Sequence, residues 1–345
     1  MKYLQLYINV LTAFHKQFYK NEDITSIYFG GGTPSLLPVE FIDKILNFIN
    51  ANFNVVSNAE ITLEANPKTI NINKAIGYKS VGINRLSIGV QSLINADLRT
   101  LGRIHNAHDA LMCVYEMSSI FPNISIDLIY NRPGQTLENW EQELSMALEL
   151  PIKHISLYEL IIEDSTYIKN LIDKGFLEQP SMSEEFFNKT IEITKIRGFE
   201  QYEVSNFAID STYYSRHNLS YWNYKDYYGV GAGAHSRVHN EFNQKCAISQ
   251  CADIHTWCEW AKEPIFEVET LSDNDVYVER LLMGLRTKFG INCNNFDMGI
   301  LLEHDFERKI WYLKQNDYIL SKGNYIVLTH EGLLRLNSVL RYLVS

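Results

Sequence analysis

Long apolar runs are missing from this sequence of 345 residues, and cysteine is scarce. No stretch approaches the roughly 18 consecutive apolar residues of a membrane-spanning helix, so we expect no transmembrane segment. The five cysteines are an odd number in a long chain, which argues against a disulfide framework and favours a reducing, cytoplasmic setting. Their spacing is also too wide for zinc or iron–sulfur motifs, which use closer pairs. We therefore expect structural roles for Cys113, Cys246, Cys251, Cys258 and Cys293.

Positive charge is in the minority, because 31 basic residues face 41 acidic residues and the net charge is −10. This balance argues against nucleic acid or an anionic membrane surface as the main partner. Residues 1–20 lack the uniform apolar stretch and the small-residue cleavage site of a signal peptide, so we predict a helix there.

Short apolar segments alternate with helical patterns in the first part of the chain. Such alternation predicts right-handed βαβ units and a parallel sheet or barrel. We expect the strands to be apolar on both faces, as in buried parallel sheets. The predicted fold class is therefore α/β, with a parallel sheet or a TIM-like barrel. The expected strands are residues 25–29, 60–65, 84–90, 123–130, 154–160 and 200–205.

The later part of the chain follows other patterns. Residues 211–270 are rich in aromatic residues and glycine, and we predict an extension of loops packed against the barrel of residues 1–210. Residues 271–345 combine helical patterns with a hairpin turn at Gly323, which predicts a small helical, winged-helix-like domain. Such domains often bind DNA, but the acidic chain favours packing or partner docking.

Polar residues gather where the predicted strands end. GGGTP at 30–34 directly follows a strand, and its glycines let backbone groups approach a ligand closely, although an ordinary turn is the alternative. In α/β barrels the active site lies at the C-terminal ends of the strands, so we expect one polar mouth there. Its expected members are Gly30, Gly31, Gly32, Thr33, Glu64, Gln91, Asp127, Tyr158 and Glu203.

Glu64, Gln91 and Asp127 are the central residues of this expected mouth. Each alone could be a helix cap or part of a structural ion pair. Together, at successive strand ends, they predict a site for a hydroxyl-rich ligand such as a ribose, because carboxylates are rarely buried without a partner. Arg103 is predicted to bind a ligand carboxylate, with an ion pair to Glu64 or Asp127 as the alternative.

The segment HNLSYW places His217 close to Tyr221 and Trp222 on an expected irregular stretch. Histidine is a common axial ligand of heme iron, and the two aromatic side chains offer flat apolar faces to a porphyrin. The alternative is that His217 and Asn218 only bind this stretch to the barrel. For the other histidines we expect structural roles.

The chain contains, in this order, YFGGGTPSLL, EITLEANP, GINRLSIGVQS, LGRIHNAHDA, ISIDLIYNRPGQT, HISLYEL, QYEVSNFA, SRHNLSYW and GVGAGAHS. Over residues 20–345 these strings resemble the oxygen-independent coproporphyrinogen III oxidase-like family of radical S-adenosylmethionine (SAM) proteins. HNLSYW, SIGVQS and RIH are similar to its heme-chaperone (HemW) branch.

The resemblance implies a barrel of the radical SAM type with SAM as a cofactor. In NRPGQT, Asn131 and Arg132 stand where the family usually has Gly-Leu, so we expect an altered loop after Asp127. The implied SAM contacts are Gly31, Gly32, Thr33, Glu64, Gln91, Arg103 and Asp127.

The family also implies a [4Fe–4S] cluster held by a CxxxCxxC motif between the first barrel strand and a helix. The sequence begins at Met1 within that helix and contains no such motif. We therefore expect a barrel without its first strand, an open sheet edge at residues 25–29, no metal site and no radical catalysis. SAM would also lose the iron that it chelates.

The function implied by the resemblance is that of a heme chaperone, which binds heme and delivers it to apoproteins. The expected recipients belong to the respiratory chain, the expected location is the cytoplasm or the inner face of the membrane, and the expected heme ligand is His217. The alternatives are an oxygen-independent coproporphyrinogen III dehydrogenase, which decarboxylates propionates by radical chemistry, and an inactive remnant of the family. HNLSYW favours the chaperone.

Overall fold

The computed structural model describes residues 2–164, 166–303 and 305–345, which form two compact units. The barrel unit comprises residues 26–39 and 60–214, and the helix-rich unit comprises residues 1–25, 40–59 and 215–345. The division into three domains that we expect from the sequence, at residues 1–210, 211–270 and 271–345, remains a prediction. No helix among the described residues is long and apolar enough to cross a bilayer.

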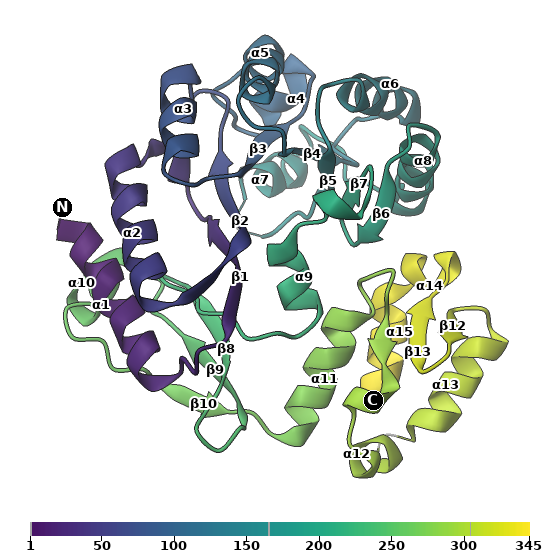
Figure 1. The fold of residues 1–345 in the computed structure, drawn as a ribbon. Helices are drawn as coiled ribbons and strands as arrows, with labels where there is room; N and C mark the ends of the chain where they lie inside the picture. Colours follow the sequence, from purple (N-terminus) through teal and green to yellow (C-terminus); the bar gives the residue numbers. More distant parts are fainter. Residues whose placement is uncertain (1, 165, 304) are drawn as a thin grey trace. The chain divides into compact units, whose positions relative to one another are not determined.

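A curled sheet of seven strands, in the order β1-β2-β3-β4-β5-β7-β6, forms the barrel unit (Figure 1). Strands β2 to β5 pair in parallel, as predicted, and β1 lies at one edge. The architecture thus confirms the predicted α/β half-barrel. The strands are β1 (Asp23–Phe29), β2 (Asn54–Ala65), β3 (Arg85–Gln91), β4 (Ile124–Tyr130), β5 (His154–Glu159), β6 (Glu200–Glu203) and β7 (Asn206–Ala208).

The strand predicted at residues 200–205 is the first arm of a hairpin. Strand β6 turns directly into β7, and β7 pairs antiparallel with both β5 and β6. The sequence alone did not predict β7, because three residues are too few to show a period.

Helices α3, α5, α6 and α8 cover the outer face of this sheet (Figure 1). Local sequence signals set their ends: Asn106 and Asp109 form a reciprocal capping box at the start of α5, and Thr136 caps α6. Buried Trp140 donates to the Thr190 hydroxyl at 2.9 Å and joins α6 to α8. The helices of the unit are α3 (Ile72–Ser80), α4 (Asn95–Thr100), α5 (Ala107–Ser118), α6 (Leu137–Leu148), α7 (Tyr167–Asp173) and α8 (Ser183–Ile196).

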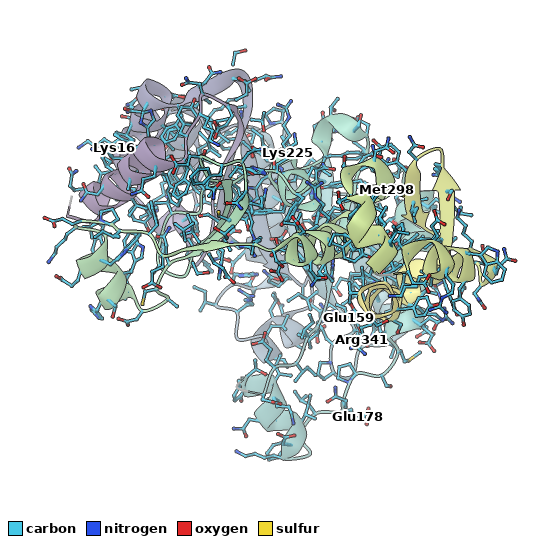
Figure 2. All side chains as sticks on the ribbon, turned by 90° about the horizontal axis from the view of Figure 1, so that it is seen from below. Lys16, Glu159, Glu178, Lys225, Met298 and Arg341 are labelled. Atoms are coloured by element: carbon cyan, nitrogen blue, oxygen red, sulfur yellow. The ribbon has the colours of Figure 1, made fainter. Side chains whose placement is uncertain are left out.

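The segment of residues 160–164 and 166–182, which includes α7, differs from the other connections because α7 has no buried residue. Tyr167 and Phe176 expose 67% and 72% of their surface. Figure 2 shows Glu178 at the far end of this segment, away from Glu159 at the end of β5. The segment therefore adds little to the core of the barrel unit.

The two faces of the sheet differ in polarity, and the expectation of strands that are apolar on both faces is wrong. Leu63, Leu86 and Ile124 are partners across β2, β3 and β4, and each is at most 1% exposed. The neighbouring row on the other face contains Glu64 and Ser87 as partners. Because side chains alternate along a strand, the inner face of the half-barrel is polar.

One part of the helix-rich unit packs α1 (Lys2–Gln17) onto a small sheet. Leu6, Val10 and Phe14 of α1 share a buried cluster with Ile248 and Trp257. The remaining elements of this part are α2 (Val39–Asn52), α9 (Arg216–Trp222), β8 (His235–His239), β9 (Lys245–Ser249), α10 (Ile254–Trp260) and β10 (Val268–Thr270).

The other part of this unit has its own core, in which Leu281, Leu313 and Leu343 are nearly inaccessible to solvent. The predicted hairpin is present, with Gly323 at φ 60° between β12 and β13. In Figure 2, Met298 marks α12 and Arg341 marks α15. The elements are α11 (Asp273–Gly284), β11 (Ile291–Asn292), α12 (Met298–Glu303), α13 (Phe306–Gln315), β12 (Ile319–Lys322), β13 (Tyr325–Leu328), α14 (His330–Leu334) and α15 (Leu336–Val344).

Candidate functional site

The glycine loop after β1 approaches the end of β2 closely. The Gly31 amide donates to Glu64 Oε2 at 3.1 Å. A Cβ atom on Gly30 would lie 2.6 Å from a ring carbon of Tyr28 and 3.1 Å from Glu64 Oε1. Gly31 and Gly32 have φ angles of 80° and 60°, which favour glycine. The loop therefore needs glycine both for its backbone conformation and for its contact with Glu64.

Glu64 has a donor on each carboxylate oxygen. Tyr28 donates to Oε1 at 2.7 Å, and the Gly31 amide holds Oε2. Burial and the negative charge of Glu64 raise the pKa of Tyr28, so this phenol remains a donor at neutral pH. The carboxylate is thus fixed while its remaining lone pairs can accept from a ligand. The sequence analysis missed Tyr28, although the residue belongs to the strand that leads into GGGTP.

Asp127 lies in the adjacent part of the inner face. Ser87 donates to its Oδ1 at 3.3 Å, and Ser156, its register partner on β5, also contributes a hydrogen bond. Burial raises the pKa of Asp127 to about 6, with a further increase from the charge of Glu64 and opposing effects of Ser156 and Arg85. Two carboxylates in electrostatic contact on a polar face are able to accept the hydroxyls of a ribose.

Gln91 stands at an irregularity of β3, where the pairing with β4 shifts register. Its φ angle is 68°, and a Cβ on Gly89 would lie 2.8 Å from Gln91 Nε2 and 3.2 Å from Asn66 Oδ1. Asn66 in turn donates to the Thr33 hydroxyl at 3.4 Å. Asn66, which the sequence analysis did not single out, thus contacts the predicted residue Thr33 and lies beside Gly89 together with Gln91.

Arg103 follows the end of α4, where Gly102 has a φ angle of 68°. The Arg103 amide donates to the Leu98 carbonyl at 2.8 Å and that of Gly102 to Arg99, the pattern of a Schellman motif. The Arg103 side chain is exposed and has no ion-pair partner among the described residues, so neither alternative ion pair forms. The negative charge of Asp127 counteracts the lowering of the Arg103 pKa by burial, so the guanidinium lies within electrostatic range of the site.

Below Glu64 and Asp127, the inner face carries a chain of buried polar groups. His154 Nδ1 lies 2.7 Å from Ser125 Oγ and 3.4 Å from Arg85 Nη2, and His154 Nε2 lies 2.8 Å from Tyr202 Oη. Burial and the charge of Arg85 hold the pKa of His154 well below its usual range, so the imidazole is neutral at pH 7. The chain gives His154 a structural role, as expected from the sequence.

The loop after β4 contains the residues that depart from the family pattern. Asn131 has a φ angle of 54°, so asparagine occupies a conformation that glycine would adopt readily. Buried Arg132 forms ion pairs with Glu143 and, at 2.9 Å, with Asp97. Glu143 also accepts from the Leu93 amide at 2.7 Å. These bonds connect the loop after β4 to the loop after β3, next to Gln91.

The HNLSYW segment belongs to the helix-rich unit. The expectation of an irregular stretch is wrong, because residues 216–222 form the short helix α9, capped by Ser215. Successive turns bring His217 and Tyr221 together, with ring centroids 4.7 Å apart, and Tyr221 contacts Tyr227 at 4.4 Å. The partly exposed His217 therefore lies beside the ring of Tyr221.

No group of three or more His, Cys, Asp or Glu side chains in residues 2–164, 166–303 and 305–345 is arranged to hold a metal ion. The five cysteines are free thiols spread along the chain. The residues present therefore do not fit a [4Fe–4S] cluster, which needs cysteine thiolates close together.

Comparisons with known proteins bear on both candidate regions. Residues 12–147 match the profile of the Radical SAM superfamily. The chain is 32% identical over 326 residues to the heme chaperone HemW of Buchnera aphidicola, covering 93% of this chain and 84% of that protein. It is 34% identical over 328 residues to the heme chaperone HemW of Bacillus subtilis, covering 92% and 84%.

A mitochondrial radical S-adenosyl methionine domain-containing protein 1 of Bos taurus is 33% identical over 345 residues, with 93% of this chain and 76% of that protein covered. Among solved structures, coproporphyrinogen III oxidase (HemN) of Escherichia coli, a radical SAM enzyme, superimposes with a TM-score of 0.81. The match covers 99% of this chain and 82% of that chain at 20% identity. At this identity the structural likeness shows a shared fold.

Proposed function

The chain belongs to the HemW family of the radical SAM superfamily, and on this basis we propose that it binds heme and delivers it to apoproteins. The observation that carries the proposal is the identity of 32–34% to heme chaperones over more than nine-tenths of the chain. The recipients expected from the sequence, respiratory apoproteins in the cytoplasm or at the inner face of the membrane, are part of the same proposal.

The helix α9 supports heme binding by its chemistry. Imidazole is a good axial ligand of heme iron, and His217 lies at ring-contact distance from Tyr221. Coproporphyrinogen III dehydrogenase activity has less support, because the likeness to HemN is one of fold and the residues present do not fit an iron–sulfur cluster.

Membership of the superfamily implies SAM as a cofactor, and part of the barrel unit fits it. Glu64 is held in place by Tyr28 and Gly31, and Asp127 lies within its electrostatic influence. We propose that these carboxylates bind the ribose hydroxyls of SAM and that Arg103 binds its carboxylate. The described residues do not fit the cluster that supplies the electron for SAM cleavage, so our proposal for SAM is limited to its binding.

Heme titration followed at the Soret band tests the main proposal. In the unaltered chain we expect a saturable Soret band, because His217 supplies an axial ligand. His217→Ala is expected to shift this band and weaken binding while circular dichroism shows a retained fold. The matched control is His235→Ala, which removes an exposed histidine that contacts Ser249 at 2.9 Å. An unchanged spectrum in His217→Ala would contradict the assignment of the ligand.

Calorimetry with SAM tests the second proposal. We expect weak binding without added iron, because the iron that SAM would chelate is missing, and weaker binding still in Glu64→Gln. Glu149→Gln is the control, since Glu149 is 64% exposed in its side chain and pairs with Arg197 on the surface. Tight SAM binding without iron, or equal binding by both variants, would contradict the proposed SAM site.

A further inference from the structure

Four cationic side chains surround the aromatic residues at the end of α9 and in the following segment. Two of them are neutralised: Arg237 pairs with Glu279 at 2.6 Å and Lys245 pairs with Asp226 at 2.7 Å. Each ion pair places one carboxylate against one cation. The other two cations of the cluster form no ion pair within the described part of the chain.

Arg280 and Arg286 of the α11 region are these two cations. The Arg280 guanidinium carbon lies 5.2 Å from the ring centroid of Tyr224, and that of Arg286 lies 5.9 Å from the ring of Trp222. Neither arginine has a carboxylate partner among the described residues. Arg286, which follows the end of α11, donates from Nη1 to the Leu282 carbonyl in the last turn of that helix.

Unused donors accompany these two charges. Arg280 Nε and the indole Nε1 of Trp222 are both buried without a hydrogen-bond partner. A buried donor without an acceptor is costly, and a cation over an aromatic ring contributes only about 0.5–2 kcal/mol. Burial also lowers the pKa of Arg286. Arg280 Nε and Trp222 Nε1 are thus donors that neither Glu279 nor Asp226, the two carboxylates of the cluster, accepts from.

The charges of Arg280 and Arg286, which have no carboxylate partner among the described residues, indicate what kind of ligand this cluster could bind. After the two ion pairs are set aside, two positive charges remain within a chain of net charge −10. Both stand beside flat aromatic faces, and α9, which bears Trp222, packs against α11. An aromatic ring system with two carboxylates matches this combination of faces and charges.

We propose that Arg280 and Arg286 bind the two propionates of heme beside Trp222 and Tyr224. This inference rests on the proposed function and adds to it the residues that recognise the anionic edge of the porphyrin. The competing explanation is that both arginines only pack α11 against the aromatic segment. That explanation predicts a loss of stability on substitution and no discrimination between a porphyrin with free propionates and one without.

The test uses the full chain and two probes, heme and heme dimethyl ester, delivered in the same detergent buffer and titrated at the Soret band. The ester keeps the iron and the ring but has no propionate charge. Arg286→Met and Arg280→Met remove the cations, and Arg286→Lys retains one in case the methionine variant does not fold. Arg335→Met is the matched control, because Arg335 also lies over a ring, that of Tyr318, but is paired with Glu331.

We expect the unaltered chain to bind heme about tenfold or more tightly than the ester, since a hydrogen bond to a charged group is typically of that strength. Each methionine variant should reduce this preference by weakening heme binding and leaving ester binding unchanged, with the Soret position unchanged, and Arg335→Met should keep the full preference. Equal affinity of the unaltered chain for both probes, or an unchanged preference in both methionine variants, would overturn this inference but not the proposed heme function. No Soret change with either probe would overturn the proposed heme function and this inference with it.

Discussion

Substitution of Asp127 by asparagine is expected to stabilise the chain at neutral pH while weakening its ligand binding. Asp127 is partly buried, and burial raises its pKa from 3.8 to about 6. The folded protein therefore holds this proton more tightly than the unfolded chain does. Such a cost is typical of functional sites, where a charge is kept for binding at the expense of stability.

The size of the effect follows from the shift in pKa. A difference of about 2 units, at 1.36 kcal/mol per unit, gives about 3 kcal/mol. Because the folded pKa is raised, the folded state binds more protons than the unfolded state between about pH 4 and pH 6, and stability falls as pH rises through this window. The cost is complete above about pH 6, so Asp127→Asn should gain about 1–3 kcal/mol there, less the cost of burying the new amide.

Urea denaturation of Asp127→Asn and the unaltered chain, at about pH 4 and about pH 7.5, measures this gain. The gain should be present at the higher pH and absent at the lower. Asp210→Asn is the control, for which we expect a change in stability of the opposite sign. Exposed Asp210 accepts hydrogen bonds from Thr212, and these bonds lower its pKa. Its ionised form stabilises the fold above the pKa of the unfolded chain, so the substitution should destabilise at neutral pH.

The functional half of the prediction uses calorimetry with SAM. Asp127→Asn is expected to bind SAM more weakly than the unaltered chain, because an amide presents one acceptor oxygen where a carboxylate presents two. A variant that is less stable at about pH 7.5, or whose gain does not depend on pH, would refute the desolvation argument. Undiminished SAM affinity would instead refute the place of Asp127 in the SAM site.

Three further outcomes are expected. Arg132→Met should cost about 3–5 kcal/mol in urea denaturation, because it leaves the Glu143 carboxylate buried without its cation; a loss below about 1 kcal/mol, the size of a surface pair, would contradict this. Gly30→Ala should cost about 1–3 kcal/mol by overpacking against Tyr28, and the loss should shrink when Tyr28 is also replaced by valine; equal losses in the two backgrounds would exclude that contact as the cause. Anaerobic reconstitution of the chain with iron and sulfide should leave it without a cluster signal in EPR, because its cysteines are not clustered; about four irons per chain with such a signal would contradict it.

The sequence predicted the strand-end residues for a topological reason. Parallel strands bring their C-terminal ends to one edge, so Gly31 and Glu64, which are far apart in the chain, meet at 3.1 Å. Glycines at 31 and 32 were informative because both adopt positive φ angles. Neither inference needed knowledge of how the strands align with one another.

The support beneath this edge depends on strand register, which the sequence did not determine. Ser87 faces Asp127, and Ser156 is its register partner, only because β3, β4 and β5 are aligned as they are. A shift of one residue would turn each of these side chains to the outer face. For the same reason the polar inner row that contains Arg85 and His154 was hidden within segments that looked uniformly apolar.

In the altered loop after Asp127, the residue that replaces glycine can still adopt the left-handed backbone conformation. Asparagine tolerates the left-handed conformation better than other residues with a side chain, and Asn131 adopts it at φ 54°. Arg132 brings a charge into the interior, where Glu143 and Asp97 neutralise it. The sequence could indicate that this loop differs, but the acids that compensate for Arg132 lie on two separate helices and became evident only in the structure.

The division of the candidate residues between the two units makes the proposed functions separable by experiment. Glu64 and Asp127 belong to the barrel unit, whereas His217, Trp222 and Arg286 belong to the helix-rich unit. The residues that we propose to bind heme thus have aromatic and charged neighbours within the helix-rich unit itself. Substitutions at Glu64 should therefore change SAM binding and leave the Soret titration intact, and those at Arg286 should do the reverse. If both ligands were lost together in either variant, heme and SAM binding would have to be coupled across the two units.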